Sequence, residues 1–413
     1  MKLQRLAWRN LSRNPRRTWI TLVSIAFGVL LSVTFTGMGD YFYTNMVNTG
    51  AKMGMGHVTV EPQGYSQNPT LAKYLNPDDA IYQSLRALDG VAGVSQTIMG
   101  QAMFASAHKS IGGALMAIEP MQYGGAANLL IESLIAGRAL GEDDARGILL
   151  GDGMAEQLHL SLGKKMVYTT TDLHGELVSS MVRVVGIFHT GVEMLDQSMG
   201  LLSMDGVRQT LGYGDRAVSI LSIYLEDQRR AAEIRDDVAA LWQQLDREMV
   251  EVLTWKESQP DLFTVIMMDK SMNYISQLLL GLLIAAGVFN TMLMGVLERR
   301  HEFGVMMALG IAPWELSRLV MIESLWLAML GLGLGGLFSV PWYLYLRDVG
   351  LDFTASLGDG MSYGGVLIDP IIRVRLFPES VVMIALAVMV LVMLATLYPA
   401  WKAGRTPPVE SLK

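Results

Sequence analysis

Residues 271–297 have the sequence SMNYISQLLLGLLIAAGVFNTMLMGVL, an uncharged run long enough to cross a bilayer as a helix. Three further stretches are equally apolar: 18–39, 324–346 and 380–401. A charge at the bilayer centre costs roughly 2.5–3.5 kcal/mol on insertion scales, so such runs seldom arise by accident. One run could be a buried core helix. Four runs, with Trp and Tyr at several ends, predict four transmembrane helices.

The composition indicates a few membrane spans joined to a water-exposed domain. Of the 413 residues, 51% are hydrophobic and 17% are charged, which is too apolar for an ordinary soluble enzyme and too polar for a chain that is all membrane. The net charge of −7 gives no basic surface for nucleic acid. The absence of cysteine excludes disulfides, thiol catalysis and thiolate metal sites.

Basic residues near the span ends predict the orientation, because cytoplasmic flanks carry an excess of Lys and Arg. The N-terminal segment has no acidic residue and several basic ones: Lys2, Arg5, Arg9, Arg13, Arg16 and Arg17. We therefore expect both termini in the cytoplasm. The first run has a long apolar core and no clear A-x-A site after it, so we expect a retained anchor and not a cleaved signal peptide.

The predicted fold class is an integral membrane α-helical protein with four transmembrane helices and a large α+β extracytoplasmic domain between helices 1 and 2. The expected segments are a cytoplasmic amphipathic N-terminal helix (1–17), transmembrane helix 1 (18–39), the periplasmic α+β domain (40–270), transmembrane helix 2 (271–297), a cytoplasmic coupling loop (298–317), transmembrane helix 3 (318–346), an extracytoplasmic loop (347–379), transmembrane helix 4 (380–401) and a cytoplasmic tail (402–413).

The large external region mixes strand and helix patterns. Alternation predicts strands at 57–61, 181–188, 217–225 and 251–255, and helical spacing predicts helices at 78–88 and 227–248. The region has no hydrolase or metalloprotease motif, so we expect no catalytic centre and no metal site. Met53, Met55 and His57 lie close together, but a chain with 29 Met produces such clusters without a metal.

The loop after the second run carries the most informative pattern. Its sequence is ERRHEFGVMMALG from Glu298 to Gly310, with charges first and an apolar face of Phe303, Met306, Met307 and Leu309 after them. Gly310 and Pro313 are typical of a helix end. This pattern predicts a short helix along the membrane with one face available to a partner; a plain connecting helix is the alternative.

Three further features concern the spans and their flanks. Leu3, Leu6, Ala7, Asn10 and Leu11 recur at helical spacing beside a basic stripe, which predicts an interfacial helix, although they could be a topology signal alone. Gly331 and Gly335 form a G-x-x-x-G motif that allows close helix contact in lipid. Glu323 lies at the inner mouth of the third span, where we expect an interfacial carboxylate with a nearby partner; a functional charge is the alternative.

The chain resembles the MacB/FtsX/LolC-type ABC permeases, closest to the LolC/LolE-like branch. The resemblance is carried by Trp8-Arg9-Asn10-Leu11 with Arg16-Arg17-Thr18, by the Glu298–Gly310 stretch, by Glu323 and the nearby glycines, and by the ending Tyr398–Arg405 with Pro407, Pro408, Val409 and Leu412. The resemblance implies that the following residues form an ATPase-coupling element: Glu298, Arg299, Arg300, Glu302, Gly304, Ala308, Leu309 and Gly310. Phe303 and Gly404 depart from the usual family residues.

The family resemblance further implies a permease that works through motion of its external domain, driven by a separate cytoplasmic ABC ATPase dimer. No P-loop motif occurs here, since Leu158 stands where the first glycine before Gly163-Lys164 should be, so ATP and Mg²⁺ are expected in the partner and no cofactor in this chain. Expected partners are a second permease copy, identical or homologous, a periplasmic carrier or membrane-fusion protein, and membrane lipid. Lipoprotein or lipid release in the bacterial inner membrane is the favoured function; the alternatives are FtsX-like control of a cell-wall hydrolase and efflux of an amphiphilic drug or peptide.

Overall fold

A computed structural model describes residues 2–119, 129–244, 250–352, 361–363, 366–368 and 371–405. The chain divides into two compact units, which we call the helix unit (Met1–Phe42, Met268–Asp352 and Ile371–Lys413) and the sheet unit (Tyr43–Met267 and Phe353–Pro370). Parts of the predicted loop 347–379 and tail 402–413, including Pro407, Pro408, Val409 and Leu412, lie outside the described residues.

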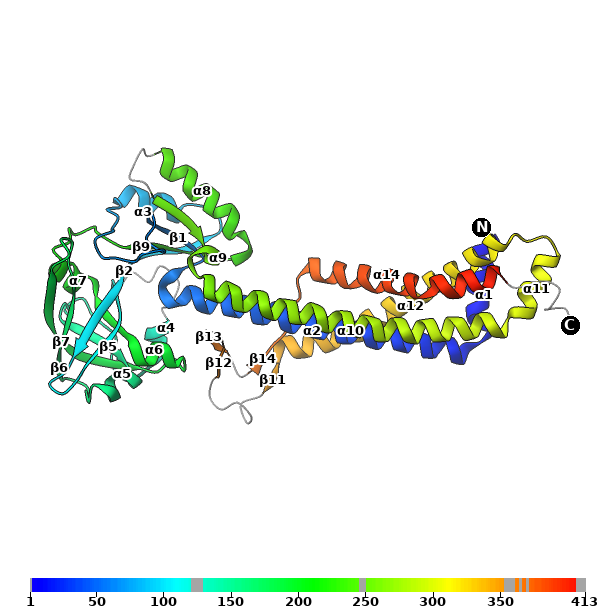
Figure 1. The fold of residues 1–413 in the computed structure, drawn as a ribbon, viewed down its shortest axis with the longest axis horizontal. Helices are drawn as coiled ribbons and strands as arrows, with labels where there is room; N and C mark the ends of the chain where they lie inside the picture. The colour runs from blue at the N-terminus through cyan, green and yellow to red at the C-terminus, as the bar shows by residue number, and fades with distance from the viewer. Residues whose placement is uncertain are drawn as a thin grey trace. The chain divides into compact units, whose positions relative to one another are not determined.

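Within the described residues, four helices are long and apolar enough to cross a membrane (Figure 1). They are α2 (Pro15–Gly50), α10 (Pro260–Glu298), α12 (Pro313–Asp348) and α14 (Pro378–Gly404), and each extends past its uncharged run into polar flanking residues. The short helices α1 (Lys2–Arg13) and α11 (Arg300–Ala308) belong to the same unit, with a two-stranded pair of β11 (Leu351–Asp352) and β14 (Ile371–Ile372).

One apolar core joins these helices. Its buried residues include Ile25 on α2, Val288 on α10, Val320 on α12 and Val392 on α14. Glycines let the helices approach closely, since a Cβ on Gly28 would lie 2.1 Å from the Ile284 side chain. Large apolar residues also cover the outside of the same helices, such as Phe27 and Leu283, which are 60% and 72% exposed. Apolar residues both inside and outside are typical of helices surrounded by lipid.

The sheet unit is built on one continuous sheet. Its strands are β1 (Val58–Pro62), β2 (Val91–Ala105), β3 (Ser110–Ile118), β4 (Leu134–Gly137), β5 (Gly147–Gly151), β6 (Lys165–Thr171), β7 (Leu177–Phe188), β8 (Met199–Ser203), β9 (Ile220–Leu225) and β10 (Val250–Thr254). The order is β10-β1-β9-β2-β3-β8-β5-β7-β4, and β6 pairs with both β2 and β7. The path β2-β3-β8-β5-β7-β6 therefore returns to β2 and closes. Of its pairs, β3 with β8 and β5 with β7 are parallel.

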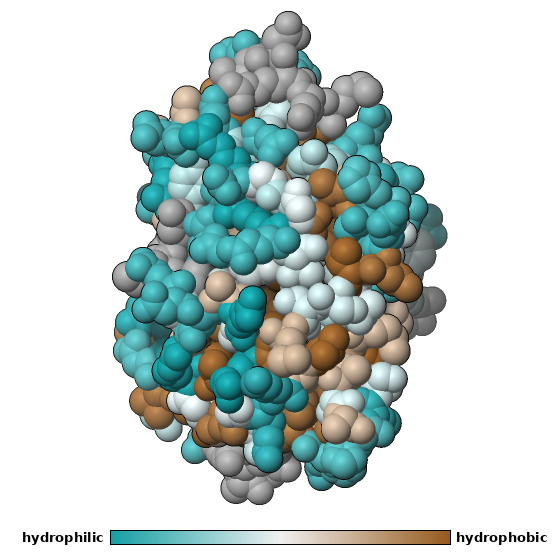
Figure 2. All heavy atoms as spheres, turned by 90° about the vertical axis from the view of Figure 1, so that its left-hand side faces the viewer, coloured by the Kyte–Doolittle hydropathy of each residue, from teal (hydrophilic) through white to brown (hydrophobic). Residues whose placement is uncertain are grey.

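Short helices cover this sheet and connect its strands. They are η1 (Ala51–Met55), α3 (Asp79–Arg86), α4 (Leu129–Glu132), α5 (Asp152–Gln157), α6 (Glu193–Ser198), α7 (Met204–Leu211), η2 (Gln228–Arg230), α8 (Ala231–Gln244) and α9 (Trp255–Ser258). A separate hairpin pairs β12 (Met361–Tyr363) with β13 (Val366–Ile368). Figure 2 shows hydrophilic residues intermixed with hydrophobic ones on one face of the molecule.

The α+β prediction for this region is confirmed, with small shifts at element ends. The strand predicted at 217–225 starts only at Ile220. The strand predicted at 251–255 ends at Thr254, because Thr254 and Glu257 form a capping box that starts α9 at Trp255. The helix predicted at 78–88 begins after Asp78, whose side chain accepts a hydrogen bond from the Ile81 N–H.

His57 has a structural role in the sheet unit. Its Nδ1 accepts a hydrogen bond from the Leu225 N–H at 3.0 Å, and its Nε2 lies 3.0 Å from Asn48 Oδ1. Burial lowers the pKa of His57 to about 4. With both ring nitrogens engaged by protein groups, His57 is not available to a metal ion together with Met53 and Met55.

Candidate functional site

The short helix α11 ends as its sequence predicts. The Ile311 N–H donates to the Met306 carbonyl at 3.1 Å, and the Gly310 N–H donates to the Met307 carbonyl at 3.0 Å. This pair of bonds is the Schellman motif, which needs a left-handed residue between helix and exit. Gly310 fills that position with φ +94°. Pro313 then opens α12, so a tight corner separates α11 from the next long helix.

The apolar side of α11 is turned mainly toward the protein, which corrects the expectation of a broad apolar face free for a partner. Phe303 is fully buried in the core shared by the long helices, and Met306 and Met307 pack against that core. The Arg299 guanidinium lies over the Phe303 ring, 5.1 Å from its centroid. A helix that follows a membrane span buries its apolar residues first against its own neighbours, which leaves less for a partner.

A buried polar network fixes the start of α11. Arg299 Nη1 lies 3.0 and 3.2 Å from the two carboxylate oxygens of Glu323 on α12. The Asn10 amide of α1 donates to the same carboxylate. The side chains of Arg299 and Glu323 are only 12% and 6% exposed. The expectation of a nearby partner for Glu323 is confirmed, but an exposed interfacial position is wrong: this carboxylate is inside the protein.

Two further ion pairs join the same end of the helix unit. Arg13 Nη1 lies 2.7 Å from Glu302, and Arg17 Nη1 lies 3.4 Å from Glu298. Arg17 fits against α10 because residue 295 is glycine; a Cβ there would lie 2.2 Å from the guanidinium. Exposed pairs of this kind contribute about 0–1 kcal/mol each, so they orient α11 more than they stabilise it.

The exposed part of α11 is its C-terminal end. Leu309 is 79% exposed, Ala308 and Gly310 are also exposed, and Trp314 at the start of α12 is 62% exposed. Arg300 is exposed at the other end of the helix. We call Ala308, Leu309, Gly310 and Trp314 the corner surface. Large apolar residues exposed at a rigid corner are typical of a protein contact.

The structure thus separates the predicted coupling residues into two groups. Glu298, Arg299, Glu302 and Gly304 contact other parts of the helix unit. The exposed residues are Arg300 at the start of α11 and Ala308, Leu309 and Gly310 at the corner. Sequence reasoning missed Trp314 and the bond from Asn10. The spacing of Trp314 after Gly310 could have indicated the first, but a contact between residues 313 positions apart leaves no local signal.

Gly331 and Gly335 lie where α12 crosses α2. A Cβ on Gly331 would lie 2.6 Å from Ile25, and one on Gly335 would lie 2.7 Å from Val29. Gly333 and Gly336 have no such neighbour within 4 Å. The two glycines of the G-x-x-x-G motif therefore allow the close approach of α2 and α12, which holds the span that carries Glu323.

Two family descriptions match the chain. The MacB-like periplasmic core domain matches residues 18–241, and the C-terminal part of FtsX-like permeases matches residues 274–408. The lipoprotein-releasing system transmembrane protein LolC of Neisseria meningitidis is 25% identical over 97% of this chain and 95% of its own length. LolC of Xylella fastidiosa is 26% identical over 64% of each chain, so that match spans less than two thirds of the relative. The solved periplasmic region of MacB from Actinobacillus actinomycetemcomitans has a TM-score of 0.36 and 14% identity, over 52% of this chain and 94% of that chain.

Proposed function

The chain belongs to the family of MacB/FtsX/LolC-type ABC transporter permeases, and from this premise we propose that it converts the motion of a separate cytoplasmic ATPase into motion of its sheet unit. It is a multi-pass membrane protein of the transport type. We propose that both termini and α11 face the cytoplasm and that the sheet unit faces the periplasm. ATP and Mg²⁺ then belong to the ATPase dimer.

The observation that carries this proposal is the construction of α11. Its base is held by Phe303 and by the Arg299–Glu323 pair, and its corner surface is exposed. A partner that binds Leu309 and moves would displace α11 together with the helices to which the base is tied. Those helices include α10, which runs without an internal proline from Pro260 to Glu298 and ends directly before Arg299.

The favoured task is release of lipoproteins or lipids from the membrane. It is supported by the similarity to the LolC proteins, which belong to lipoprotein-releasing systems and are 25–26% identical to this chain. A permease of this kind works as a pair, with an identical or a homologous copy, and a periplasmic carrier would receive a released lipoprotein.

The test uses the full chain with its ATPase in lipid nanodiscs. Leu309→Glu places a charge on the corner surface without touching the core and should lower the coupled ATPase rate at least tenfold. The matched control is Leu177→Glu, which makes the same substitution at the start of β7 in the sheet unit, where Leu177 is 77% exposed and lies outside the apolar spans. Equal ATPase rates in both variants and the unmodified chain would show that the corner is only a connection between two spans.

A further inference from the structure

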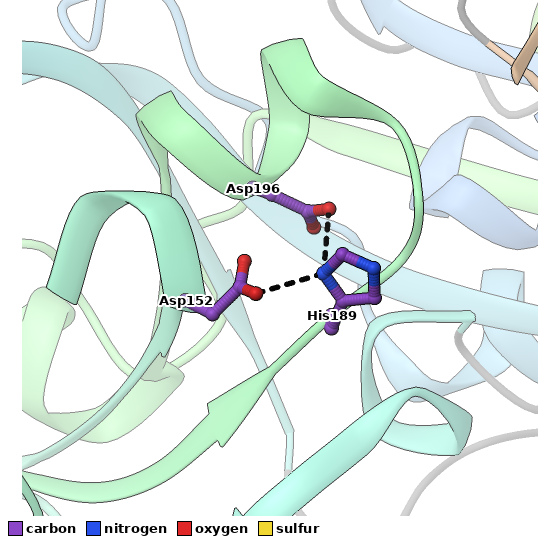
Figure 3. A group of neighbouring side chains, drawn as sticks. All are labelled: Asp152, His189 and Asp196. Atoms are coloured by element: carbon purple, nitrogen blue, oxygen red, sulfur yellow. Dashed lines mark hydrogen bonds and ion pairs between the residues drawn. The ribbon is translucent and has the colours of Figure 1, made fainter. Parts of the chain in front are cut away.

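A second cluster of side chains lies in the sheet unit, at the ends of two adjacent parallel strands. Gly151 at the end of β5 pairs with Phe188 at the end of β7. The next residue on each strand is therefore placed at the same edge: Asp152 on one and His189 on the other. Asp196 reaches this edge from α6 (Figure 3). The carboxyl ends of neighbouring parallel strands are common places for binding sites.

The three side chains direct their donor atoms toward one another. His189 Nδ1 lies 2.8 Å from Asp152 Oδ2 and 3.4 Å from Asp196 Oδ2. One possible ligand atom from each of the three residues lies within 4.8 Å of the other two. In Figure 3 both dashed lines meet at the same ring nitrogen, so two carboxylates share one imidazole nitrogen. A neutral ring has one N–H and can donate to only one of them.

The carboxylates are held in place by backbone groups. Asp196 is only 4% exposed, and its Oδ1 accepts hydrogen bonds from the N–H and the hydroxyl of Thr190, both at 2.8 Å. Asp152 Oδ1 accepts the Gly153 N–H at 2.7 Å. Asp196 Oδ2, which faces the ring, also accepts the Gly191 N–H at 3.1 Å, so both carboxylates are oriented by the surrounding backbone. This is the outer-shell support that orients metal ligands.

Two glycines make this approach possible. A Cβ on Gly151 would lie 2.2 Å from the carbonyl oxygen of Asp196, and one on Gly153 would lie 3.2 Å from the same oxygen. Any larger residue at position 151 would push α6 away from α5. The backbone of Asp196 can therefore reach the edge of β5 and β7 only because these positions carry no side chain.

From this geometry we propose that Asp152, His189 and Asp196 bind a zinc ion through Asp152 Oδ2, His189 Nδ1 and Asp196 Oδ2. The ion replaces the proton on Nδ1 and balances two carboxylates that a single imidazole cannot neutralise. Metal–ligand distances near 2.0–2.1 Å in a tetrahedral site place donor atoms about 3.3 Å apart. The Asp196–His189 distance already matches, and the Asp152–His189 distance must widen by about 0.5 Å.

The donor set selects the class of metal. A nitrogen ligand with two carboxylates suits Zn²⁺ and similar transition metals, whereas Mg²⁺ and Ca²⁺ prefer oxygen ligands alone. The side chains of His189 and Asp152 are 53% and 38% exposed, which leaves room for water as the fourth ligand. Because the ligands come from the start of α5, the end of β7 and α6, zinc binding joins three segments of the sheet unit.

The test uses the full chain, purified in detergent without a histidine tag, stripped with EDTA and titrated with Zn²⁺ and, separately, with Co²⁺. We expect one equivalent of Zn²⁺, a rise in melting temperature, and the strong visible absorption of four-coordinate Co²⁺. His189→Ala and Asp152→Asn should each weaken binding by at least about 100-fold, since even loss of an outer-shell partner costs 10–100-fold.

Two control variants remove exposed histidines elsewhere in the sheet unit. His174→Ala and His108→Ala should bind zinc as the unmodified chain does; His108 is included because its ring lies 6.4 Å from that of His159. The proposal is overturned if the unmodified chain binds no zinc, if His189→Ala binds it equally well, or if His108→Ala is the variant that loses it. Unchanged circular dichroism of the metal-free variants separates loss of the ligand from loss of the fold.

Discussion

Replacing Arg299 and replacing Glu323 should lower the free energy of unfolding by different amounts, and the structure predicts which loss is larger. Arg299→Met leaves Glu323, 6% exposed, with the Asn10 amide as the remaining partner that the structure shows. Glu323→Leu leaves Arg299 with Glu302, whose carboxylate lies 3.4 Å from Nε and is 37% exposed. The arginine thus keeps a partner in contact with water, whereas the glutamate keeps only a neutral amide.

The magnitudes follow from the cost of a buried charge without a counter-charge. Removal of one member of a buried pair costs about 3–5 kcal/mol. We expect the loss of stability in Arg299→Met to lie at the upper end of this range, and the loss in Glu323→Leu to lie at or below its lower end. The double variant Arg299→Met/Glu323→Leu buries no charge at this point, so it should be more stable than either single variant. Glu323→Gln keeps the shape and should lie between Glu323→Leu and the unmodified chain.

The measurement is reversible unfolding of the full chain in mixed detergent micelles, with the coupled ATPase rate recorded on the same samples. A double-mutant cycle gives the interaction energy of the pair without the separate effects of each change. If the two single costs simply add in the double variant, the pair does not interact as described. If the double variant is stable but no longer supports the coupled ATPase rate, the role of the pair is to fix α11 in position and not to stabilise the fold.

Two further predictions concern packing and pH. Gly335→Leu should lower stability by about 1–3 kcal/mol through overpacking against Val29, whereas Gly333→Leu on the same helix, with open space around residue 333, should change it little; equal effects in thermal unfolding would refute the packing argument. For His57, burial lowers the pKa from its ordinary value of 6.5 to about 4, so the unfolded chain takes up a proton first as pH falls. Stability is then full above pH 6.5 and is lost between pH 6.5 and 4, by about 2 kcal/mol at pH 5. Denaturant titrations at pH 7.5 and 5.0 measure this loss, which should shrink in His57→Gln; an equal loss in that variant would assign it to other groups.

Much of the helix unit could be predicted from sequence because its determinants are local. A long uncharged run is a property of consecutive residues, and so is the ending of α11 at Gly310. The direction in which the apolar face of α11 points is not determined by local sequence. Phe303 is apolar whether it contacts a partner or the protein core, and only the arrangement of α2, α10, α12 and α14 decides between them. The burial of Glu323 has the same origin, since Asn10 and Arg299 reach it from distant parts of the chain.

The cluster of Asp152, His189 and Asp196 differs from the sequence expectation that the external region holds no metal site. Its residues are separated by 37 and 7 positions, and no metal motif has this spacing. The parallel pairing of β5 with β7 brings the first two together, and the pairing of strands distant in sequence cannot be deduced from alternation alone. The two glycines beside Asp152 were the only signal in the sequence, since glycine within a strand end often marks a close backbone approach.

The proposed mechanical role requires that the sheet unit hold its own helix ends firmly, residues 43–50 of α2 and 260–267 of α10. The segment that follows α2 is attached to β9: the Ser222 hydroxyl donates to the carbonyl of Gly54 in η1 at 2.6 Å, and the His57 N–H donates to the Ile223 carbonyl at 2.8 Å. At Gly56, φ is +69° and a Cβ would lie 2.8 Å from the Ile223 nitrogen.

The start of α10 packs closely against the end of α2, because a Cβ on Gly50 of α2 would lie 2.7 Å from the Leu262 side chain. The last turns of α2, from Tyr43, and the first turns of α10, up to Met267, belong to the sheet unit, in which β1 pairs with β9 and β10. The strands β2, β3, β8, β5, β7 and β6 form a closed circuit. A change of shape within that circuit would break hydrogen bonds between its strands. If α2 and α10 are displaced, the sheet unit should move as a whole, because deforming it would cost more free energy. The proposed coupling needs this property.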